Sequence, residues 1–157
     1  MFNEPELKDE DNPEKLNVIK LICLGLMLCG GTYDLKARVF YDVVQDNMQQ
    51  KISSSDKDFM IAFTTMVELV CYMIPRQYRN ESGAPFMTGH YPEPGSLKFR
   101  NTVEELKEIF LDEVFGEESN LKRGDFLLKM SQKSKWLFES EDVRARWAKL
   151  CEEYKEE

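Results

Sequence analysis

Oxygen-bearing side chains recur along a polar run, residues 45–56, that lies between two apolar segments with helical periodicity. A calcium-binding loop of this length places oxygen ligands at positions 1, 3, 5, 7, 9 and 12, glycine at position 6 and an apolar residue at position 8. With Ile52 at position 8, Gln50 replaces the glycine and only the last ligand is a carboxylate. The side chains that could contact a cation are Asn47, Gln49, Ser53 and Asp56. We therefore expect no tightly bound metal, with a weak Ca²⁺ or Mg²⁺ site at Asp56 as the alternative.

A second polar run, residues 114–125, repeats this plan with Leu121 at position 8. Its first ligand position holds Val114 and its ninth holds Lys122, so an apolar group and a positive charge would face the cation. The apolar residue at position 8 has a separate role, because its backbone pairs with that of the neighbouring loop. Ile52 and Leu121 therefore predict a two-strand antiparallel ribbon that forms without an ion.

Groups suited to catalysis are sparse in this chain. The single histidine, His90, lies in a Gly- and Pro-rich stretch with no plausible nucleophile nearby in sequence. The pair Gly30-Gly31 follows a helical segment rather than a strand and lacks the wider spacing of a phosphate-binding loop. We expect this protein not to be an enzyme.

The first half of the chain predicts three helices. Asn12-Pro13 favours a helix start, and the buried helix that follows should end at Gly30-Gly31. Thr32 should cap the second helix, whose apolar residues recur with a period of 3.6. A third helix is expected from about Ser55 to Ile74, with Pro75 ending it.

The second half begins with an aperiodic stretch, residues 76–101, that is rich in glycine and proline and predicts a long connector. Thr102 followed by Glu105 forms a capping box and should open the next helix. A helix starting near Phe126 and a last helix over 140–154 follow. The expected total is about six helices.

Composition and charge restrict the function. The net charge is −8, from 29 acidic and 21 basic residues, and nucleic acids or anionic membranes would require a basic surface. Four cysteines without CxxC spacing are typical of buried, reduced thiols. The start of the chain has no signal-peptide pattern, and the stretch from Val18 to Cys29 is too short to span a bilayer. We expect a cytoplasmic protein without membrane insertion.

Together these features resemble a degenerate EF-hand pair. The segments LMLCGGTYDLKARVFYDVV, KISSSDKDFMIAFTTMVELVCYMI and NTVEELKEIFLDEVFGEESNLKRGDFLLKMSQKSKWLF are similar to the C-terminal half of the neuronal calcium sensor, calcineurin B and calaxin group. The turn at Gly31, Thr32 and Lys36 and both position-8 residues match that group, whereas the ligand set departs from it. The resemblance covers Leu28 to Phe138. An unrelated helical bundle is the alternative.

The resemblance implies an all-α, EF-hand-like lobe with about six helices and a minimal ribbon between the loops. The predicted organisation has a disordered acidic N-terminus, 1–12, and a single helical domain, 13–157. Within that domain we expect a first hand at 32–75, the connector 76–101, a second hand at 102–138 and the C-terminal helix 140–154.

The function implied by this resemblance is protein binding without catalysis. Lobes of this shape hold an amphipathic helix of a larger assembly in an apolar groove, here largely without calcium; an atypical Ca²⁺ or Mg²⁺ sensor using the first loop is the alternative. A basic or amphipathic helix would suit the acidic chain. The C-terminal helix could also fill the groove permanently. The expected groove residues are Phe40, Phe63, Met66, Val67, Val70, Phe110, Phe126, Met130 and Trp147.

Overall fold

The structure, a computed structural model, describes residues 3–45, 50–82 and 91–153, except the side chains of 79–82. Its helices and strands are η1 (Pro5–Leu7), α1 (Val18–Leu28), α2 (Tyr33–Val44), β1 (Lys51–Ser53), α3 (Lys57–Glu68), η2 (Leu69–Met73), α4 (Ile74–Ser82), α5 (Leu97–Val114), β2 (Asn120–Lys122), α6 (Arg123–Lys133), η3 (Lys135–Phe138) and α7 (Ser140–Glu153). Since α3, η2 and α4 form one continuous run, the described residues contain six long helices and one antiparallel strand pair. The all-α prediction with a minimal ribbon is confirmed.

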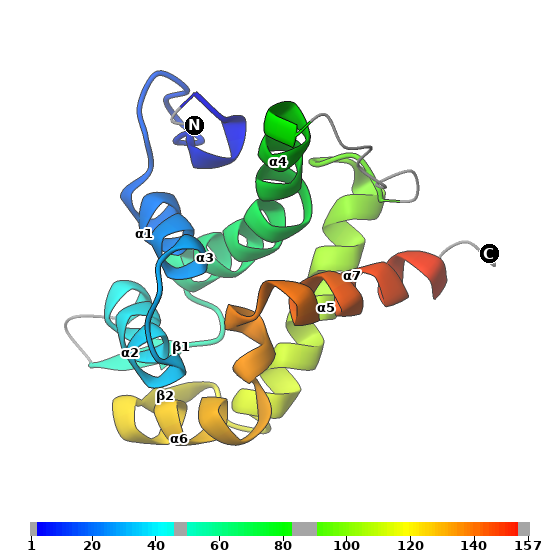
Figure 1. Ribbon diagram of the computed structural model, residues 1–157. Coiled ribbons are helices and arrows are strands. Elements are labelled where there is room, and N and C mark those ends of the chain that lie inside the picture. Colours follow the sequence, from blue (N-terminus) through cyan, green and yellow to red (C-terminus); the bar gives the residue numbers. More distant parts are fainter. Residues whose placement is uncertain (1–2, 46–49, 83–90, 154–157) are drawn as a thin grey trace.

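Helix α3 lies at the centre of the fold and contacts α1, α2, α5 and α7. Figure 1 shows α1 and α2 on one side of the molecule, α7 crossing α5 on another, and α6 beside the strand pair. Buried apolar side chains from all of these helices form one cluster. Phe59 illustrates its aromatic character, because its ring contacts those of Phe40, Phe63, Phe110 and Phe115.

The starts of α1 and α2 follow local capping chemistry. The Thr32 side chain accepts a hydrogen bond from the Leu35 N–H, as predicted for the start of α2. Helix α1 begins later than Asn12-Pro13 predicted, because Asn17 is its N-cap and accepts from the Lys20 N–H. Asn12 instead belongs to a turn before α1 and accepts from the Lys15 N–H through its carbonyl.

Pro75 does not end the third helix. The turn before it, η2, is π-helical, with a wider hydrogen-bond pattern than the α-helix. Such a turn changes the donor and acceptor pairing around a proline that has no N–H to give. The helix therefore continues as α4 to Ser82, and the predicted connector 76–101 is helical at both ends.

Helix α5 begins five residues before the predicted capping box. Its N-cap is Ser96, whose side chain accepts from the Phe99 N–H at 3.1 Å. Thr102 lies inside the helix, where it is buried and donates to the Lys98 carbonyl at 2.8 Å. Inside a helix, a threonine hydroxyl can donate to the carbonyl of the residue four positions earlier, so the cap-like pattern at Thr102 was misleading.

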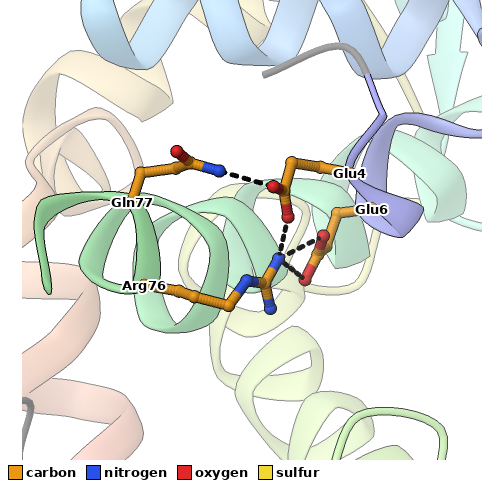
Figure 2. Close-up of polar contacts among 4 residues, drawn as sticks. All are labelled: Glu4, Glu6, Arg76 and Gln77. Carbon is orange, nitrogen blue, oxygen red and sulfur yellow. Dashed lines mark hydrogen bonds and ion pairs between the residues drawn. The ribbon is translucent and has the colours of Figure 1, made fainter. Parts of the chain in front are cut away.

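The N-terminal segment is described from residue 3 and packs against the helices, whereas residues 1–12 were expected to be disordered. Leu7 is fully buried, and Lys8 forms a β-bridge with Leu16. Figure 2 shows Arg76 of α4 pointing to Glu4 and Glu6 of the N-terminal segment, while Gln77 donates to Glu4. The Arg76 guanidinium lies 2.8 Å from Glu6, whose side chain is only 5% exposed. These partners are 70 or more residues apart in sequence, so no local pattern could reveal them.

Beside this segment lies Glu68 of α3, in a hollow that Glu10 and Lys20 also line. Burial raises the pKa of Glu68 to about 7; Lys20 opposes this shift, and Glu6 and Glu10 add to it. Between about pH 4.5 and pH 7 the folded chain therefore holds a proton that the unfolded chain has released.

We expect the free energy of unfolding to fall as the pH rises through this range, with Glu68 contributing up to about 3 kcal/mol. Chemical denaturation at pH 5 and pH 8 measures the change. Glu68→Gln should reduce the difference between the two values, whereas Glu108→Gln, at an exposed site on α5, should leave it as in the original chain. Equal pH dependence in both variants would contradict this role of Glu68.

One helical run, Lys57–Tyr78, is long and apolar enough to cross a membrane by length and composition. In this fold 67% of its apolar window is buried inside the protein, and core helices pass the same test. The expectation of no membrane insertion stays a prediction.

Candidate functional site

The two polar loops lie side by side, as their position-8 residues predicted. Strands β1 and β2 pair antiparallel with Ile52 opposite Leu121. Ile52 is fully buried and Leu121 is 2% exposed. The contact is apolar on the core side and uses backbone hydrogen bonds between the strands. The predicted ribbon is confirmed, and it joins the two halves of the helical cluster.

Residues near the first loop already have partners within the protein. Asp56 is the N-cap of α3 and accepts a hydrogen bond from the Asp58 N–H at 3.3 Å. The Ser53 hydroxyl lies 3.1 Å from that of Ser55. Asn47 and Gln49 lie outside the described residues. Within the described parts of the chain, no group of three or more His, Cys, Asp or Glu side chains could hold a metal ion.

The backbone before β1 takes a shape that usually requires glycine. Gln50, at position 6 of the loop, has a φ of 51°, and its carbonyl accepts a hydrogen bond from the Tyr41 hydroxyl at 2.9 Å. Non-glycine residues adopt this left-handed region at a cost of roughly 1 kcal/mol. In the second loop Gly116 has a left-handed φ, and it follows Phe115, the C-cap of α5. The two loops therefore turn differently before they pair.

The predicted groove is closed in the structure. All nine of its proposed side chains are 1% exposed or less, and they pack in the core. Segment η3 and helix α7 supply the groups that cover them: Phe138 contacts the Phe40 ring, and Trp136 contacts Phe110. Trp147 of α7 lies against Tyr72 and against Phe99 in the same way. Partner binding by these nine residues stays a prediction and would require α7 and η3 to move.

Glu113 of α5 holds this cover in place and was not identified from the sequence. Its carboxylate accepts hydrogen bonds from the Ser134 hydroxyl and the Trp136 indole N–H, each at 2.7 Å. Arg146 of α7 lies 3.5 Å from the same carboxylate and stacks on the Trp136 ring at 4.5 Å. One side chain therefore connects α5, η3 and α7. Acidic residues on helices are common, so the sequence carried no signal for it.

An apolar hollow of about 290 Å³ is open between α1 and α2. We call it the α1–α2 hollow; its lining residues are Ile22, Gly25, Leu26, Cys29, Gly30, Leu35, Lys36 and Val39. Leu35 is 55% exposed there, although Leu is a residue that folding normally buries. Helical periodicity predicts helices on both sides of this hollow but does not separate their exposed face from the core.

The thiols differ sharply in access. Cys29 in the α1–α2 hollow is exposed, whereas Cys23, Cys71 and Cys151 are buried. Burial raises the pKa of Cys23 to about 12, so this thiol stays protonated at neutral pH. His90, the residue considered for acid or base chemistry, lies outside the described residues.

Comparisons with protein-family models, curated proteins and solved structures gave no match. The resemblance to EF-hand proteins therefore stays a prediction.

Proposed function

We propose that this chain is a non-enzymatic adaptor of EF-hand-like architecture that binds an amphipathic helix of a larger assembly without needing a metal ion. The observation that carries the proposal is the α1–α2 hollow, an open apolar surface in a fold where most large apolar side chains of the described residues are buried. Grooves of this kind hold the apolar face of a helix in many complexes.

Ion independence is supported by how the loops are held. The β1–β2 pair is fixed by two buried aliphatic side chains, and Asp56 serves as a helix cap. Gln50 has a left-handed φ of 51° at the position where a calcium loop has glycine. The two loops are therefore held together by a contact that does not involve a cation.

The adaptor function is tested by comparing the proteins captured by two matched variants. Leu35→Glu places a negative charge in the α1–α2 hollow. Leu128→Glu is the matched control: it places the same charge on α6, outside the hollow, at a leucine that is 56% exposed, compared with 55% for Leu35. We expect a defined set of proteins to bind the original chain and the Leu128 variant, and to be lost with the Leu35 variant. If both variants capture the same proteins, the hollow is not the binding surface.

Metal independence gives a separate prediction. Sensor loops bind Ca²⁺ at roughly 10⁻⁷–10⁻⁵ M through several carboxylates, so a calorimetric titration of this chain should show no saturable heat in that range. The melting temperature should also be the same in EDTA and in Ca²⁺. A shift of several degrees on chelation would contradict the prediction and favour a sensor.

A further inference from the structure

A second hollow, of about 350 Å³, lies beside the α1–α2 hollow. Lys36 of α2 lines both of them, and Met27 of the second follows Leu26 of the first along α1. The remaining lining residues come from the end of η3 and the first turn of α7: Phe138, Glu139, Ser140, Glu141 and Asp142. Lys36 is therefore shared by a largely apolar hollow and a polar one.

The polar part is negatively charged. Glu139, Glu141 and Asp142 are all exposed, and Lys36 is the single cationic side chain among the residues that line this hollow. Acidic residues in the first turn also favour α7 itself through the helix dipole. The helix dipole explains why acidic residues are favourable in the first turn of α7. It does not explain why this turn lies beside an open apolar hollow.

We propose that the two hollows form one docking surface for a short amphipathic helix whose apolar stripe continues at one end into lysine or arginine side chains. The inference rests on the proposed adaptor function and specifies its partner. Apolar side chains of the partner would cover Leu35 and its neighbours, and its basic end would lie against the three carboxylates. The same carboxylates would repel anionic lipids and nucleic acids, so this surface favours a basic protein partner over either of them.

Cys29 provides a direct readout of docking, because it lines the α1–α2 hollow and is exposed while the other three thiols are buried. A thiol reagent should therefore modify Cys29 first, and a helix in the hollow should slow that reaction. The measurement reports occupancy of this surface rather than binding anywhere on the protein.

The probes are synthetic peptides of about 15 residues, a length at which an isolated helix is marginal and docking can order it. The test peptide has a leucine stripe and lysines at one end. A second has the same composition with the stripe scrambled, and a third has glutamates in place of the lysines. We expect only the test peptide to slow Cys29 modification, and the effect to weaken as salt increases.

Charge variants of the full chain test the acidic part. Glu141→Lys with Asp142→Lys should weaken binding of the test peptide by about tenfold at low salt, since each exposed ion pair contributes modestly. Glu108→Lys with Asp112→Lys, two exposed acidic sites on α5, makes the same change of net charge elsewhere and should have little effect. Glu141→Gln with Asp142→Asn removes the two charges without reversing them, so it should give an intermediate loss of affinity for the test peptide. This variant keeps the test decisive if the lysine variant folds poorly.

The outcomes separate this inference from the adaptor function. If the α5 variant weakens binding as much as the α7 variant, or the glutamate peptide binds equally well, the acidic part of the surface is not used. In that case a protein set lost only with Leu35→Glu would still support the adaptor. Binding of anionic vesicles in preference to the test peptide would overturn the inference. Equal capture by the Leu35 and Leu128 variants would instead remove the adaptor function.

Discussion

Replacing Trp147 by alanine is expected to lower the free energy of unfolding by about 3–5 kcal/mol. Trp147 is fully buried, and its ring lies 5.5 Å from that of Phe99 and 6.2 Å from that of Tyr72. The substitution leaves a large cavity between α7, η2 and α5, and these elements can collapse only partly around it. A loss of this size is a large share of the stability of a protein of this length.

Urea denaturation followed by circular dichroism measures the effect, with Lys149→Ala as the control on the same helix. Lys149 is exposed, so its replacement should change stability by less than about 0.5 kcal/mol. Binding of an apolar dye should rise with the Trp147 variant if α7 loosens while the rest of the fold persists. Unchanged stability would mean that α7 is not part of the core and that the predicted groove can open freely.

Ile52→Ala should cost about 3 kcal/mol, the second large effect. The side chain is fully buried on β1, opposite Leu121 of β2. Its removal weakens the contact that joins the two loops. Because the contact is apolar, the loss should be the same in EDTA and in Ca²⁺.

A double-mutant cycle with Leu121→Ala measures whether the two residues act together. Residues in contact show coupling that distant residues do not, so the double variant should lose less than the two single losses added together. Lys51→Ala serves as the control, since that partly exposed side chain lies on the same strand. Strictly additive losses would indicate that the ribbon pairs without side-chain cooperation.

We expect a partner to bind at the open α1–α2 hollow rather than at the predicted nine-residue groove, which is closed. Opening the nine-residue groove would expose a large aromatic surface and would break the Glu113 contacts with η3 and α7. Binding at the α1–α2 hollow requires neither change. A partner helix at this hollow would therefore use a surface that is already accessible, and α7 would remain part of the structural core.

Local signals in the sequence were sufficient for several elements. The cap at Thr32, the helical period of α2 and α3, and the last helix follow from interactions within a few residues, and the structure shows each of them. The pairing of Ile52 with Leu121 was also predictable, although these residues are far apart. An isolated apolar residue in a polar loop has few places to be buried, and two such loops can bury theirs against each other.

Tertiary contacts decided the rest. The N-terminal segment packs against the helices because Leu7 enters the core and Arg76 binds Glu6, which no local pattern indicates. The helix passes Pro75 through a π-helical turn, and α5 is capped by Ser96 rather than by the predicted capping box at Thr102. Above all, periodicity shows which helix face is apolar but not what covers that face. For α3 and α5 the cover is η3 and α7, whereas between α1 and α2 part of the apolar face stays open. That difference depends on how the helices pack, and packing is set by contacts between residues distant in the chain.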